Sequence, residues 1–144
     1  MDENKSIFPV GYHNFHKKQV YNFQLNRWLS LSLARYEDMK EIGKNVDSFE
    51  DWKNENIRMA KKAESEGRLL NAAIYYRSAE FYIIKGGKEK EKLYDKFTEL
   101  FYKAVEGENF EKTKSPYKDT FLPVLKIAAK EKCIRSIVIL NACD

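Results

Sequence analysis

Apolar residues recur at helical spacing along the first three quarters of the chain, from about residue 19 to residue 105. In the first part of this region they fit two helices joined by a bend near residues 32–35 better than one long rod. A third helix is predicted to begin after Ser48, because a serine hydroxyl can cap the free amides of a first helical turn. The acidic residues that follow suit the positive end of the helix dipole. Gly67 is expected to end this helix.

The apolar positions also separate a surface helix from a buried one. The third helix carries its apolar residues on one face: Trp52, Met59, Ala60 and Ala63. The next stretch, "LLNAAIYYRSAEFYII", has apolar or aromatic side chains on every side, which predicts a buried central helix. Gly86 and Gly87 are expected to end it. A last amphipathic helix sets Lys and Glu opposite an apolar face, which comprises Leu93, Phe97, Leu100, Phe101 and Ala104.

Beyond Gly107 the hydrophobic period changes to that of strands. Strands are predicted near residues 110–116, 121–128 and 134–140, with a turn at Lys118-Asp119. Pro123 marks the middle strand as an edge strand or a bulged one. The predicted fold is therefore α+β and mainly α: about five helices followed by a small antiparallel sheet of two or three strands.

Three parts are expected along the chain: a flexible lead-in over residues 1–18, a helical cap-like domain over 19–107, and a small β segment over 108–144. The length of 144 residues fits one domain, or one domain with a small appendage. A sheet of two or three strands is only marginally stable unless a helix or another chain covers it.

Charge and composition exclude several classes of function. The 26 basic and 22 acidic residues are interspersed, so the net charge of +4 forms no basic patch for nucleic acid. No stretch approaches the ~20 apolar residues of a membrane span, and the N-terminus lacks an apolar signal region. Cys133 and Cys143 bracket the last predicted strand, too far apart to pair with each other, so we expect free thiols and a cytoplasmic protein.

Catalytic chemistry is hard to find in these residues. His13 and His16 form H-x-x-H without a further ligand at metal-binding spacing, so we expect surface histidines and neither a metal nor a cofactor. The chain contains no G-x-S-x-G, G-x-x-x-x-G-K-[ST] or G-x-G-x-x-G. A cysteine nucleophile, Cys133 or Cys143, paired with one of the histidines also lacks a supporting motif. No catalytic residue is assigned, and whether the protein is an enzyme stays open at this point.

The central helix offers a second class of function, a protein-interaction module. Five residues follow the spacing of the second helix of a tetratricopeptide repeat: Gly67, Ala72, Tyr75, Tyr76 and Ala79. In a peptide receptor, aromatic residues such as Tyr75, Tyr76 and Tyr82 would line a groove. A solenoid needs about three copies and the chain holds one, so a single tight helical hairpin with mostly buried aromatics is the simpler interpretation.

A family resemblance rests on four stretches taken together: "NFQLNRWLSLSLARYEDM", "SFEDWKNENIRMAKKAESEGRLLNAAIYYRSAEFY", "KEKLYDKFTELFYKA" and "SPYKDTFLPVLKI". In combination they resemble the N-terminal region of bacterial α/β-hydrolases of the 2,6-dihydropseudooxynicotine hydrolase and fermentation/respiration-switch type. The resemblance covers about residues 23–144. It implies that the helices form a cap beside a hydrolase core, that the strands open the core sheet, and that the family hydrolyses ester, amide or carbon–carbon bonds with a serine nucleophile.

The resemblance breaks down at the loop that should help to form an oxyanion hole. In this family an apolar triplet is followed by His-Gly-Gly, an aromatic residue and Asp. Here residues 137–139 match the triplet and Asp144 matches the acid, but Leu140, Asn141 and Ala142 replace His-Gly-Gly. The elbow, acid and histidine of such a hydrolase would come later in the chain. The sequence therefore predicts a truncated, inactive hydrolase-like protein, with a homodimer through the open C-terminal strand edge or the helical face as a further possibility.

Overall fold

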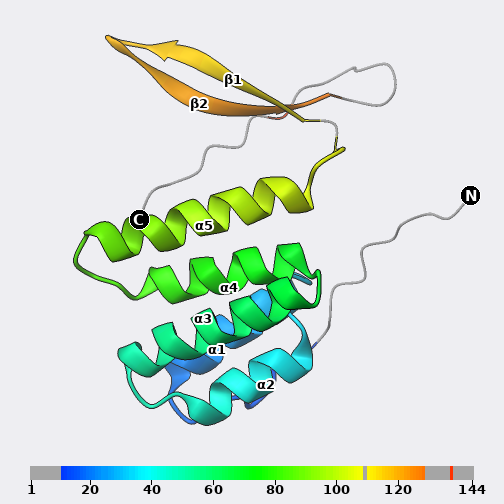
Figure 1. Cartoon of the computed structure of the whole chain (residues 1–144), viewed down its shortest axis with the longest axis vertical. Coiled ribbons are helices and arrows are strands. Elements are labelled where there is room, and N and C mark those ends of the chain that lie inside the picture. Colours follow the sequence, from blue (N-terminus) through cyan, green and yellow to red (C-terminus); the bar gives the residue numbers. More distant parts are fainter. Residues whose placement is uncertain (1–10, 109, 129–136, 138–144) are drawn as a thin grey trace, which may run out of the picture. The chain divides into compact units, whose positions relative to one another are not determined.

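The computed structural model describes residues 11–108, 110–128 and 137, and it divides into two compact units at Glu106 and Gly107 (Figure 1). The first unit contains α1 (Gln19–Ser30), α2 (Tyr36–Asn45), α3 (Phe49–Ser65), α4 (Leu69–Phe81) and α5 (Lys88–Ala104). The second contains β1 (Phe110–Tyr117) and β2 (Thr120–Ile127). The predicted fold class, mainly α with a small antiparallel sheet at the C-terminal side, is confirmed.

The predicted bend separates α1 from α2. Ser32, in the connection between the two helices, has a φ of 57°, a left-handed conformation that an α-helix cannot contain. The amide of Asn71 in α4 donates to the carbonyl oxygen of Leu33 at 2.9 Å, so a backbone group of the bend is satisfied from another helix. Two helices rather than one rod therefore form over this region, as predicted.

Ser48 caps α3 as its sequence position predicts. Its hydroxyl oxygen accepts a hydrogen bond from the Asp51 backbone N–H at 3.1 Å, while the Asp51 carboxylate accepts one from the Ser48 backbone N–H at 2.9 Å. This reciprocal pair is a capping box and satisfies two amides that the helix itself leaves free. At the other end, Gly67 has a φ of 72° and follows the last turn of α3.

The central position of α4 is confirmed, because it packs against both α3 and α5 (Figure 1). Alanines on α3 and α4 let the two helices approach closely; Ala60, Ala63, Ala72 and Ala79 are fully buried. The end of α4 differs from the prediction. The helix stops at Phe81, five residues before Gly86, and Gly87, with a φ of 145°, instead precedes the first turn of α5.

The core of the helical unit centres on Trp52 of α3. This side chain is 1% exposed, stacks on Tyr21 of α1 with ring centroids 5.4 Å apart, and donates its Nε1–H to the carbonyl oxygen of Ser78 in α4 at 2.8 Å. One residue thus joins three helices through both its apolar surface and its polar atom. Within the described residues, no helix is both long and apolar enough to cross a membrane.

Residues 11–18 correct part of the expected flexible lead-in. Phe15 is buried, His13 and His16 are half-buried, and the backbone of this segment is hydrogen-bonded to side chains of α1. The two histidines are therefore held by the helical unit and do not lie free on its surface. Residues 1–10, the rest of the expected lead-in, lie outside the described residues.

The strands β1 and β2 form a regular antiparallel hairpin. Tyr117 pairs with Thr120 across the two-residue turn at Lys118-Asp119, and the register continues without a bulge to Phe110 opposite Ile127. Almost every residue of the hairpin is exposed. The predicted third strand, residues 134–140, lies outside the described residues except for Ile137, which belongs to no strand and is 87% exposed.

Candidate functional site

The residues that the sequence singled out do not form a site among the described residues. Leu140, Asn141 and Ala142, the counterpart of the oxyanion loop, lie outside the described residues. Tyr75 and Tyr76 are buried in the helical unit, so they cannot line an open peptide groove. Tyr82 is half-buried, and its ring packs edge-on against Trp52.

Tyr75 belongs to a buried polar cluster that joins α2 to α4. Its hydroxyl donates to the Asp38 carboxylate at 2.8 Å and accepts the backbone N–H of Arg35 at 3.2 Å. The guanidinium of Arg68 donates to the same carboxylate at 2.9 Å. Burial, together with the hydrogen bond to Asp38, raises the pKa of Tyr75 above its usual range, so this hydroxyl stays protonated. A phenol held in that state is a structural donor and no general base.

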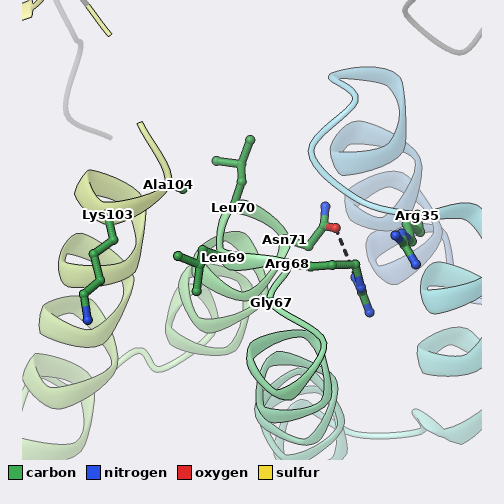
Figure 2. A pocket seen from close by; sticks show the side chains of 8 residues that line it. All are labelled: Arg35, Gly67, Arg68, Leu69, Leu70, Asn71, Lys103 and Ala104. Atoms are coloured by element: carbon green, nitrogen blue, oxygen red, sulfur yellow. Dashed lines mark hydrogen bonds between the residues drawn. The ribbon is translucent and has the colours of Figure 1, made fainter. Parts of the chain in front are cut away.

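Arg68 of this cluster also lines an open cavity. The cavity, about 330 Å³, lies where α3 gives way to α4 and is lined by Arg35, residues 67–71, Lys103 and Ala104. Figure 2 shows Arg35 and Lys103 on either side of the start of α4, with Arg68 and Asn71 hydrogen-bonded between them. The lining thus combines three cationic side chains with a helix N-terminus.

The local sequence explains this concentration of positive charge. Arg68 occupies the N-cap position of α4, where its side chain makes no capping hydrogen bond, and the first turn of α4 contains no acidic residue. Burial lowers the pKa of Arg68, but hydrogen bonds and charges from Glu66 and Asp38 outweigh it and raise that pKa above its ordinary value. Two carboxylates, those of Asp38 and Glu66, therefore already balance the charge of Arg68, the most buried cation of the cavity. The main role of Arg68 is thus to hold the fold together.

The described residues hold no set of groups that performs acyl transfer. Both ring nitrogens of His16 are engaged by backbone groups, and His13 lies against the rings of Phe15 and Tyr36. Among the described residues, these contacts pair neither histidine with a hydroxyl nucleophile, which is the pairing that a triad requires. No group of three or more His, Cys, Asp or Glu side chains in the described part of the chain could hold a metal ion.

Sequence reasoning missed two features that the structure brings together. The cavity at the start of α4 has a weak signal in the sequence, since Glu66 and Arg68 flank the Gly67 stop and Arg35 and Asp38 begin the second helix. The attachment of residues 13–16 to α1 has another, because Asn22 and Asn26 are four residues apart on one helix face. Paired buried asparagines predict a polar partner.

Comparisons with known proteins found no matching family model, no matching curated protein and no matching solved structure.

Proposed function

We propose that this chain is the helical cap and first hairpin of an α/β-hydrolase-like protein. In this proposal its described residues help to form the surroundings of the substrate and do not perform the hydrolysis. The observation that carries the proposal is the distribution of apolar side chains on β2. This distribution fits a strand of a sheet that is covered on both faces.

The side chains of β2 alternate between two faces, and each face carries apolar residues. One face carries Phe121, Pro123, Leu125 and Ile127, and the other carries Leu122 and Val124 beside Lys126. The five large apolar side chains among them are between 36% and 78% exposed in the hairpin. An antiparallel hairpin that covers a core on one side normally alternates apolar with polar residues, whereas a strand buried on both faces is a continuous apolar run. The pattern supports a place in an α/β sheet.

The helical unit supports the cap part of the proposal. It has its own core around Trp52, and the described residues contain neither a nucleophile–base pair nor a metal cluster. The family that the sequence resembles places such helices beside a catalytic core. A cap joined to the first strands of such a core is expected to consist of a helical unit with its own core and a hairpin with exposed apolar side chains. The described residues have this organisation.

Two measurements on the full chain test this proposal. Hydrolysis of p-nitrophenyl butyrate should proceed no faster than with a control protein, and turnover of order 1 per second would contradict the absence of chemistry. A hydrolase core of the resembled family, expressed without its own cap and first hairpin, should bind the chain. Replacing Leu122 and Val124 with Ser should abolish that binding, while the matched change Thr113→Ser on β1 should preserve it. No binding by the unaltered chain would overturn the cap assignment.

A second candidate, a dimerisation module, is supported by the same exposed hairpin, but two prolines restrict how it could assemble. Because a two-residue turn closes the hairpin, Tyr117 and Thr120 form a hydrogen-bonded pair, and the pairs alternate from there. Pro116 and Pro123 both fall in the other class of pair, in which the backbone nitrogen points away from the neighbouring strand. Each open edge therefore lacks one donor, which disfavours strand addition.

A dimer of this chain would consequently bury hairpin faces or helix faces more readily than hairpin edges. Light scattering on the unaltered chain separates the two candidates. A monomer from low to high micromolar concentration would contradict the dimerisation module and leave the cap proposal intact. A tight dimer that Leu125→Ser dissociates would favour the module.

A further inference from the structure

The segment that precedes α1 lies along that helix and is held by two of its asparagines. Asn26 uses both ends of its amide: Oδ1 accepts the His13 N–H at 2.7 Å, and Nδ2 donates to the His13 carbonyl at 2.9 Å. One turn earlier, Oδ1 of Asn22 accepts the N–H groups of Phe15 at 2.8 Å and of His16 at 3.0 Å. Both asparagines are buried. The two asparagine side chains bind backbone groups of the segment, as the edge of a β-sheet binds an added strand.

The side chain of Phe15 is buried next to these backbone contacts. Phe15 is 8% exposed, and its ring lies 5.2 Å from that of Tyr36 and 5.3 Å from that of His13. Gly43 of α2 makes the approach possible, because a Cβ at this position would lie 2.3 Å from the carbonyl oxygen of Phe15. A glycine inside a helix costs about 1 kcal/mol relative to alanine, so its presence is explained by the chain that passes over it.

His16 makes the last of these contacts, at the other end of the segment. Its Nδ1 accepts the backbone N–H of Lys18 at 2.8 Å, so the neutral ring carries its proton on Nε2, which donates to the carbonyl oxygen of Val46 at 2.8 Å. The segment is thus held by backbone contacts, by the burial of Phe15 and by a hydrogen bond that its own His16 imidazole donates. These are the elements of a peptide-binding site.

We propose that the surface of α1 and α2 that residues 13–16 cover (the groove) is a binding site for an extended peptide with phenylalanine directly before histidine, and that residues 13–16 of this chain are its resident ligand. The contacts need no covalent link between segment and helix. An equivalent peptide of another chain can therefore compete for the groove. The chain's own segment occupies the groove until such a peptide displaces it. This inference does not depend on the hydrolase proposal.

The first test disables the resident segment in the full chain. Phe15→Pro removes both the ring and the N–H that Asn22 accepts, and should leave the groove open to a fluorescent peptide with the sequence of residues 11–18. Fluorescence anisotropy should show one peptide bound per Phe15→Pro chain and at least tenfold weaker binding to the unaltered chain. Adding Asn26→Ala should weaken binding to the variant at least tenfold. The matched control Phe23→Ala, at an exposed phenylalanine of α1, should bind like the unaltered chain.

The second test fills the groove from the helix side. Gly43→Ala improves the helical preference of α2 but places a methyl group against the Phe15 carbonyl. Hydrogen exchange should show faster exchange of the His13, Phe15 and His16 amides, with the protection of α3 and α4 retained. Because the groove is now blocked, this variant should not bind the peptide. Retained protection of the three amides in Gly43→Ala, or equal peptide binding by Phe15→Pro and the unaltered chain, would overturn the proposal.

Discussion

The helical unit and the hairpin differ in what happens to their apolar side chains. Among its described residues, the helical unit buries twenty of them in one contiguous cluster. In the hairpin, by contrast, Phe121, Leu125 and Ile127 are all more than half exposed. The first unit therefore has a core of its own, whereas a two-stranded hairpin with exposed apolar side chains is only marginally stable by itself. The difference separates a unit that should fold alone from one that needs a partner layer.

The largest effect on the free energy of unfolding is expected when one large aromatic side chain is removed from the helical unit and, for comparison, one from the hairpin. Trp52→Ala should lower the free energy of unfolding by about 3–5 kcal/mol, because it leaves a cavity among three helices and removes the bond to Ser78. Phe121→Ala should change it by less than about 0.5 kcal/mol. Urea unfolding followed by far-ultraviolet circular dichroism measures both. Equal losses would show that the hairpin belongs to the cooperative core.

The buried cluster around Asp38 gives the next largest effect. Asp38→Ala should cost about 3 kcal/mol, because it leaves the Tyr75 hydroxyl without an acceptor and removes one of the two carboxylates that balance Arg68. Urea midpoints of the variant and of Glu37→Ala, the exposed neighbour on the same helix, provide the comparison. A loss no larger than that of the control would show that the cluster is not what joins α2 to α4.

The features that were predicted correctly from the sequence are those determined by residues close to one another in the chain. The Ser48 cap, the Gly67 stop and the apolar face of Trp52, Met59 and Ala63 depend on residues within a few positions of one another. The end of α4 was predicted too late, because Tyr82 and Ile83 continue an apolar run that in fact turns away after Phe81. Apolar content alone does not distinguish a helical residue from a buried loop residue.

The features that sequence reasoning missed depend on contacts between distant positions. His13 is held by Asn26, thirteen residues away, and His16 reaches Val46, thirty residues away. Two histidines in a polar lead-in predict an exposed segment unless their partners are known. The cavity at the start of α4 likewise combines Arg35, Arg68 and Lys103 from three places in the chain. No local spacing indicates that they meet.

The cap of α3 provides a smaller test within the helical unit. Ser48→Ala should cost about 1 kcal/mol, because the Asp51 N–H loses its acceptor at the first turn. Ser65→Ala is the matched control at the other end of the same helix, where the hydroxyl only donates to a carbonyl of the preceding turn. Thermal unfolding of the two variants should therefore show a clear shift for Ser48→Ala alone. Identical shifts would contradict the capping role.

The same cap predicts a pH dependence. Hydrogen bonds from the Ser48 hydroxyl and from the backbone N–H groups of Asp47 and Ser48 hold the pKa of Asp51 below its ordinary value. Since the folded pKa is the lower one, the carboxylate stabilises the fold above its unfolded pKa of about 3.9, and this contribution disappears as the pH falls through the folded value. Asp51→Asn should lower stability at pH 7 and leave it nearly unchanged at pH 2. A constant difference would exclude this linkage.

The smallest effects are expected for exposed ion pairs, and here the two units should differ only slightly. Glu111 and Lys126 face each other across the hairpin at 3.9 Å with both side chains about two-thirds exposed, so Glu111→Gln should leave the unfolding midpoint unchanged. Glu41 instead accepts from Arg58 at 2.7 Å and from Lys62 at 3.3 Å, which join α2 to α3 and lower its pKa. Glu41→Gln should therefore cost up to about 1 kcal/mol at low salt and less at 1 M salt. A larger and salt-dependent loss of unfolding free energy for Glu111→Gln than for Glu41→Gln would contradict this prediction. It would show that charge pairs stabilise the hairpin more than they stabilise the helical unit.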